Sequence, residues 1–260
     1  MAGARRLEDA RLHLEVFGQP VAIDLGVHVG AGCTPLDLWE PARDIAEALT
    51  AASLAEVGKA GKSISCAAGC GACCRQLVPI SALEATALLA VVERMPEERR
   101  DRIRARFADA VQQMERAGLL DPRAPPGRSA LISTQTEPKA QWRDVSQRYW
   151  ALQLACPLLE DESCGIYAER PMICREYHVT TPKEHCATLD PRTEAAPWPL
   201  RMSEVLAKVG GEIAGAHEGS LPFALALEWA QAHGAAFAAS RDGAQMFHTM
   251  VRVIEESWEG

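Results

Sequence analysis

Eight of the nine cysteines of this 260-residue chain lie in two short segments. The first segment, CAAGCGACC, contains Cys66, Cys70, Cys73 and Cys74. The second contains, with seven, nine and eleven residues between them, Cys156, Cys164, Cys174 and Cys186. Thiolates bind zinc ions and iron–sulfur clusters. The grouping therefore predicts that these eight cysteines, the clustered cysteines, are metal ligands. Because both segments have too little apolar periodicity to order themselves, we also expect them to converge on one region, where metal ligation can order them.

A cysteine can also be a small buried apolar residue, which is the interpretation we favour for the isolated Cys33. It does not suit the clustered cysteines, whose neighbours are glycines, prolines and charged residues. Gly69 and Gly71 would allow the first segment to turn and direct several sulfurs to one point. Adjacent side chains diverge, so Cys73 and Cys74 indicate either two metals or one spare thiol.

Three arginines next to the cysteines are predicted to bind the cofactor: Arg75, Arg170 and Arg175. A centre of several thiolates is anionic, and guanidinium groups could offset its charge or donate to sulfur. For Arg75 an ordinary surface position is an equal alternative. His178 or His185 could replace one cysteine as a ligand, although an ordinary loop histidine is the favoured interpretation of both.

Composition excludes several classes of partner. The net charge of −8 and the pI near 5.4 disfavour nucleic-acid binding. No apolar run reaches the length of a membrane span, and the N-terminus lacks the apolar core of a signal peptide. We therefore expect metal ions as partners, no membrane or nucleic acid, and a cytoplasmic location, where cysteines stay reduced.

Three other motifs are weak. The arginines between positions 99 and 106 alternate with acidic residues, which favours a solvated helix face. The GKS at 61–63 lacks the earlier glycine of a phosphate loop. The Cys66, Cys70 and Cys73 spacing matches a radical S-adenosylmethionine cluster, but the βα alternation of that fold is missing.

The elements that must position the cysteines are mostly helices. Alternation of apolar residues predicts a strand at 21–29. Helical spacing predicts helices over 41–57, 81–92, 141–155, 201–215, 222–239 and 243–258, and another that begins at 96. Ser81 and Glu84 are predicted to form a capping box at the start of the helix over 81–92. A turn-rich interruption is expected at 121–127 and irregular structure at 156–190.

These elements predict a mainly α fold, a single compact helical domain with irregular metal-binding loops and a short N-terminal strand pair. Within it we expect an N-terminal segment, 1–60, packed on the core. The cysteine-cluster domain would span 61–190, and C-terminal helices of the same globule would span 191–260.

The motifs C-P-x-L at Cys156, C-x-I-Y at Cys164 and R-P-x-x-C-R ending at Arg175 follow the first cluster in this order. Together they resemble the YkgJ-type cysteine-cluster family (CxxCxxCC), a bacterial-type family of zinc- or iron-chelating domains, over about 66–186. The resemblance implies bound zinc or iron. The same motif occurs in flagellin lysine methylases, which implies that the module can accompany chemistry.

The predicted function is a metal-binding protein that holds an iron–sulfur cluster, the preferred cofactor, or Zn2+. The alternative is an iron–sulfur metalloenzyme with redox or methyl-transfer chemistry. The sequence shows no separate set of catalytic residues, so the binding interpretation leads.

Overall fold

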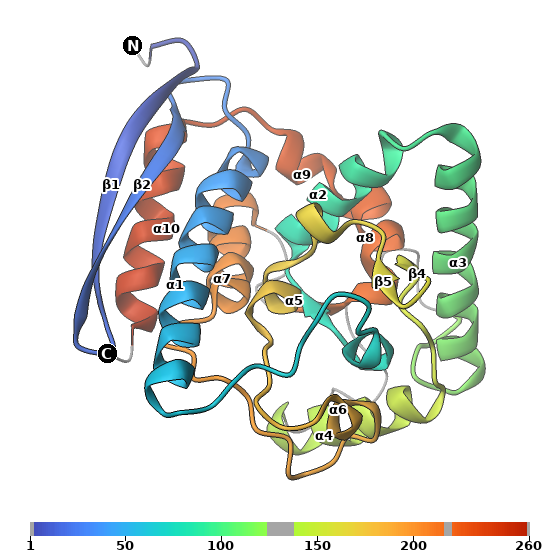
Figure 1. The fold of residues 1–260 in the computed structure, drawn as a ribbon. Helices are drawn as coiled ribbons and strands as arrows, with labels where there is room; N and C mark the ends of the chain where they lie inside the picture. Colours follow the sequence, from blue (N-terminus) through green and yellow to red (C-terminus); the bar gives the residue numbers. More distant parts are fainter. Residues whose placement is uncertain (1–2, 124–137, 216–219, 259–260) are drawn as a thin grey trace.

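In a computed structural model, residues 3–123, 138–215 and 220–258 are described. Most of the interruption predicted at 121–127 lies outside these residues. The described part is mainly helical, as predicted, with a strand pair at the N-terminus (Figure 1). None of the described helices has both the length and the apolar character of a membrane span.

The N-terminal pair is a long antiparallel hairpin of β1 (Arg6–Val16) and β2 (Gln19–Val29). Phe17 and Gly18 connect them, both with positive φ, as a two-residue hairpin turn requires. The strand predicted at 21–29 is confirmed, and its alternate apolar residues face the core. β2 packs against α1 (Trp39–Lys59) and α10 (Gly243–Ser257), and β1 pairs on its far side (Figure 1).

The centre of the helical body is α2 (Ala82–Glu93), which packs against α7 (Met202–Ala214) and α8 (Ala226–His233). Its predicted capping box is confirmed, because the Ser81 hydroxyl accepts from the Glu84 N–H while the Glu84 carboxylate accepts from the Ser81 N–H. The helix predicted over 222–239 is broken at Gly234 into α8 and the short α9 (Ala235–Ala238), after a 3-10 turn at Phe223–Leu225.

Two further helices border the cysteine-rich region. α3 (Glu97–Arg116) buries the apolar face predicted for it, including Ile103 and Phe107. α4 (Pro138–Ala151) begins and ends earlier than the helix predicted over 141–155. The polypeptide also forms a short pairing of β3 (Pro79–Ile80) with β6 (Leu221–Pro222).

The irregular region predicted at 156–190 contains only short elements. They are β4 (Leu159–Glu160), β5 (Ser163–Cys164), the 3-10 turn Tyr167–Glu169, α5 (Met172–Glu176) and α6 (Lys183–Ala187). The clustered cysteines of the second segment are therefore carried by turns and helix ends. Their positions must be fixed by contacts with the helical body.

Candidate metal centre

The first cysteine segment folds as two successive turns. The Cys70 N–H donates to the Ala67 carbonyl at 3.1 Å, and Gly69 between them has φ +79°. A 3-10 turn, Ala72–Arg75, then carries Cys73 and Cys74. The chain also turns at Gly71, whose carbonyl accepts from the Cys74 N–H at 3.0 Å, but its φ is negative, so this turn does not require the conformational freedom of glycine. An added Cβ at Gly71 would lie against the Glu162 carboxylate, the end of an exposed side chain, and 3.2 Å from a methyl group of Leu159.

Backbone hydrogen bonds join the two cysteine segments, although about eighty residues separate them. The Cys156 N–H donates to the Cys74 carbonyl at 2.7 Å. The Gln76 side chain donates to the Cys186 carbonyl at 2.8 Å, and Ser65 N–H donates to the Val179 carbonyl at 2.9 Å. Figure 1 shows the loop after α1 passing beside α5, α6 and β5. The predicted convergence of the two segments is confirmed.

The thiols themselves are close enough to influence one another. Cys73 is the common partner, since its thiolate charge would raise the pKa of five others, Cys66, Cys156, Cys164, Cys174 and Cys186. Its own pKa is raised, first by a hydrogen bond with Cys74 and then by burial. Cys70 likewise acts on Cys66 and Cys186. All eight clustered cysteines therefore form one group of free thiols.

For five thiols of this group, burial is the largest cause of the raised pKa. It raises the pKa of Cys156 to about 12 and that of Cys174 well above its ordinary value. It also raises the pKa of Cys66, Cys164 and Cys186. These five thiols are protonated at neutral pH, so a metal must displace protons to bind them as thiolates.

Cys33 lies elsewhere, fully buried in the core behind the hairpin. Its surroundings match the apolar interpretation given to it from the sequence. Burial raises the pKa of its thiol as well. It is therefore suited to serve as a control position for thiol chemistry.

Arg170 is the predicted arginine whose charge acts on the most thiols, Cys66, Cys73 and Cys164, whereas that of Arg175 acts on Cys164. The charge of Arg170 partly offsets the effect of burial on the pKa of Cys66 and Cys164. The guanidinium carbon lies 4.0 Å from the centroid of the Tyr167 ring, a cation–π contact. Among the described residues, its buried Nε has no hydrogen-bond partner. Arg170 thus presents an unused N–H donor and a positive charge to this region.

The other two predicted arginines hold loops. Arg75 forms a bidentate pair with Glu162, with a shortest distance of 2.6 Å, and donates to the Gly71 carbonyl at 3.1 Å. Arg175 is buried, which lowers its pKa, and it donates to the carbonyls of Ala168 and Arg170 and to the Glu47 carboxylate. Their part in cofactor binding stays a prediction.

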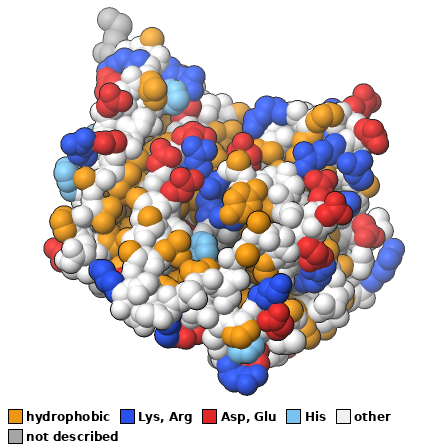
Figure 2. Space-filling model, in the orientation of Figure 1, with side chains coloured by type: hydrophobic (Ala, Val, Ile, Leu, Met, Phe, Trp, Pro, Cys, Tyr) orange, Lys and Arg blue, Asp and Glu red, His pale blue; other side chains and the backbone are white. Residues whose placement is uncertain are grey.

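Arginines of α3 also hold the second segment, which corrects the expectation of a purely solvated helix face. Arg99 donates to the Glu160 carboxylate at 2.9 Å and to the Gly165 carbonyl at 2.8 Å. Arg106 donates to the Leu159 carbonyl at 3.3 Å. The outer surface of α3 is otherwise covered by interspersed charges of both signs (Figure 2). Two of its arginines therefore fix the β4–β5 hairpin that carries Cys164.

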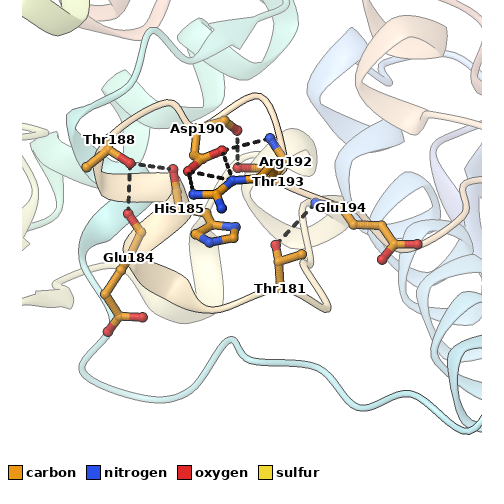
Figure 3. Close-up of polar contacts among 8 residues, drawn as sticks. All are labelled: Thr181, Glu184, His185, Thr188, Asp190, Arg192, Thr193 and Glu194. Atoms are coloured by element: carbon orange, nitrogen blue, oxygen red, sulfur yellow. Dashed lines mark hydrogen bonds and ion pairs between the residues drawn. The ribbon is translucent and has the colours of Figure 1, made fainter.

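The loop after Cys186 is tied together around Asp190 (Figure 3). The Asp190 carboxylate accepts from the backbone and side chain of Arg192, and the Thr193 hydroxyl donates to the Asp190 carbonyl at 2.7 Å. His185 lies inside this loop, and its Nδ1 is buried without a hydrogen-bond partner in the described structure. His178, by contrast, places Nδ1 3.3 Å from the Glu176 carbonyl oxygen.

Two buried carboxylates, which the sequence did not assign to the site, anchor the helix that carries Cys174. Glu84 accepts from the N–H of Met172, the first residue of α5, at 2.8 Å. Glu176, at the end of α5, accepts from the N–H of Met202 at 2.6 Å and the hydroxyl of Ser203 at 3.0 Å, where α7 begins. Burial raises the pKa of Glu84, and that of Glu176 to about 7. The capping box identified Glu84 only as a local cap, and Glu176 had no sequence signal.

The donor chemistry fits zinc or iron, since eight neighbouring thiols are accompanied by buried N atoms of Arg170 and His185 that have no partner among the described residues. Within the described part of the chain, however, no three His, Cys, Asp or Glu side chains are arranged to hold a metal ion. Binding would therefore require several cysteine side chains to rotate toward a common point.

Comparison with protein families gives one match. Residues 65–192 match the CxxCxxCC model, whose description is "putative zinc- or iron-chelating domain". In this chain three residues, rather than two, separate the first two cysteines of the pattern. Comparisons with curated proteins and with solved structures found no match.

Proposed function

Because residues 65–192 of this chain match the model of the CxxCxxCC family of zinc- or iron-chelating domains, we propose that its clustered cysteines hold an iron–sulfur cluster. Zn2+ is the alternative occupant of the same thiols. The observation that carries the proposal is the single group of eight thiols, with Cys73 as the common partner. Bound iron–sulfur would supply electron transfer, whereas zinc would supply a closed structural site.

Three features support iron–sulfur over zinc. Cys66, Cys70 and Cys73 form a close triplet in one loop, and the other ligands come at irregular intervals, which clusters tolerate. Arg170 offers a positive charge and a free N–H to an anionic centre. The nine cysteines are all free thiols, so we also propose a reducing compartment such as the cytoplasm.

Purification without oxygen should give a brown protein with broad absorption near ~400 nm, because thiolate-bound iron absorbs there and d10 zinc does not. The same sample should contain iron and acid-labile sulfide. Colourless protein with stoichiometric zinc would restore the zinc assignment. Folded protein without any metal and with eight titratable clustered thiols would exclude both.

Arg170→Gln should lower the reduction potential of the bound cluster by tens of millivolts. A nearby cation stabilises the reduced, more negative form, so its removal favours the oxidised form. A redox titration followed by absorbance would measure the shift. Arg75→Gln is the matched control, since Glu162 already neutralises that guanidinium. Equal shifts in the two variants would contradict a special role for Arg170.

We propose an iron–sulfur enzyme as the second candidate, because a hollow of about 380 Å³ opens beside the cluster region. Arg94, Arg99, Gly165 and Tyr167 are among the residues that line it, and Gly165 directly follows Cys164. Redox or methyl-transfer chemistry on a protein or small molecule would use such a space. Consumption of S-adenosylmethionine by reduced, cluster-loaded protein, lost in cluster-free protein, would favour the methyl-transfer form of this candidate.

A further inference from the structure

The N-terminal hairpin leaves one long strand edge open. β1 runs for 11 residues and, within the described residues, pairs along its length only with β2. β2 separates it from α1 and α10 (Figure 1). An exposed edge strand presents unpaired N–H and C=O groups that can pair with another strand. The outer edge of β1 is therefore a surface able to extend the sheet.

The side chains along this edge carry an incomplete charge pattern. Arg11 lies opposite Asp24 of β2 and forms an ion pair with it at 2.5 Å. Asp9, on the same face of β1, lies opposite Gly26. Its carboxylate has no hydrogen bond or ion pair in the part of the chain that the structure describes. Figure 2 shows charges of both signs and a histidine along this outer edge.

We infer that β1 pairs antiparallel with β1 of a second copy of this chain, across a two-fold axis at Ala10. With this axis, residues that lie equally far from Ala10 on its two sides are opposite each other in the two copies. Side chains from the same face of each hairpin then stay on one face of the extended sheet. Asp9 of each copy then lies opposite Arg11 of the other. Asp24 and Arg11 of one copy and Asp9 of the second copy then form a ladder of carboxylate, guanidinium and carboxylate across three strands. The two-fold axis generates a second, identical ladder.

Charge selects this register over its neighbours. An axis at Asp9 would place two aspartates opposite each other, and an axis at Arg11 would place two arginines opposite each other. Like charges directly opposite destabilise a strand pair. The axis at Ala10 instead places Leu7, whose side chain is 62% exposed, opposite His13 of the second copy, which would cover part of its apolar surface.

The test is the mass of the full metal-loaded chain in solution, measured by sedimentation equilibrium without oxygen and with reductant, so that no disulfide links two copies. The wild-type protein should be dimeric. Asp9→Arg and Arg11→Asp should each raise the dimer dissociation constant at least about tenfold, because both cross-strand pairs become like-charged. The triple variant Asp9→Arg/Arg11→Asp/Asp24→Arg, which exchanges every charge of the ladder including the Arg11–Asp24 pair within each copy, should restore dimerisation.

Asp101→Arg on α3, which lies on the opposite side of the molecule in Figure 1, is the matched control and should leave the dimer unchanged. Circular dichroism would verify that each variant is folded. A monomeric wild type, a dimer unaffected by the single reversals, or a triple variant that stays monomeric would each overturn the inference.

Discussion

Cys73→Ala should lower metal affinity by at least about 100-fold, more than the loss of an outer-shell partner costs. Cys73 interacts with thiols of both segments, so its removal takes away the side chain that acts on five of the other clustered thiols. Metal content per protein after anaerobic purification, and its loss to a chelator, would measure the effect.

Cys33→Ala is the control for this result. It removes a thiol from the apolar core, distant from the clustered cysteines, and should leave metal content unchanged. The substitution should lower only the free energy of unfolding, by about 1 kcal/mol, because it removes a small buried group. Full metal content in Cys73→Ala would mean that the metal centre is not organised around this residue.

Glu84→Ala should destabilise the protein by roughly 3 kcal/mol. The substitution leaves the buried N–H groups of Ser81 and Met172 without their acceptor, and each loss costs about 1–3 kcal/mol. Removal of the buried carboxylate also removes its desolvation cost. The net loss of stability is therefore smaller than the sum of the losses from the two N–H groups. Urea unfolding of wild type and variant at one pH would measure the difference.

Glu93→Ala, at the exposed end of the same helix, is the matched control. Its side chain is 41% exposed and pairs with Arg104 at the surface, so the expected change is below about 0.5 kcal/mol. Glu84→Ala should also weaken metal retention, since Met172 begins the helix that bears Cys174. Equal stability of the two variants would show that Glu84 does not anchor α5.

Local signals in the sequence predicted the parts of the fold that local chemistry determines. The Ser81–Glu84 capping box located the start of α2, and the alternation at 21–29 located β2. The charges in Arg6–Val16 concealed the alternation of β1, whose inward residues Ala10, Leu12 and Leu14 are only partly buried. Gly234 interrupts a run that was predicted as one helix, and an added Cβ there would lie against the Ala230 carbonyl oxygen.

For the candidate metal centre, the residue types predicted the chemistry of the site, whereas the contacts that position these residues could not be predicted. Clustered cysteines indicated convergence because such segments cannot bury an apolar core of their own. Glu176, for example, accepts hydrogen bonds from Met202 and Ser203, which are distant in the sequence, and no sequence pattern indicates that contact. Arg175 was expected near sulfur, yet backbone carbonyls and Glu47 take its donors. Which residues ligate the metal stays a prediction.

The buried contacts of Glu176 and Arg175 also limit where the chain can be cut into fragments that fold. Glu176 lies inside the family match at 65–192, but its partners Met202 and Ser203 lie beyond it. Arg175 depends in the same way on Glu47, which precedes the match. A fragment cut at the borders of the match would keep a buried carboxylate and a buried guanidinium while losing these partners. The homologous module and the unit able to fold by itself are then different lengths of chain, so transplanting the module into another protein would require carrying α1 and α7 with it.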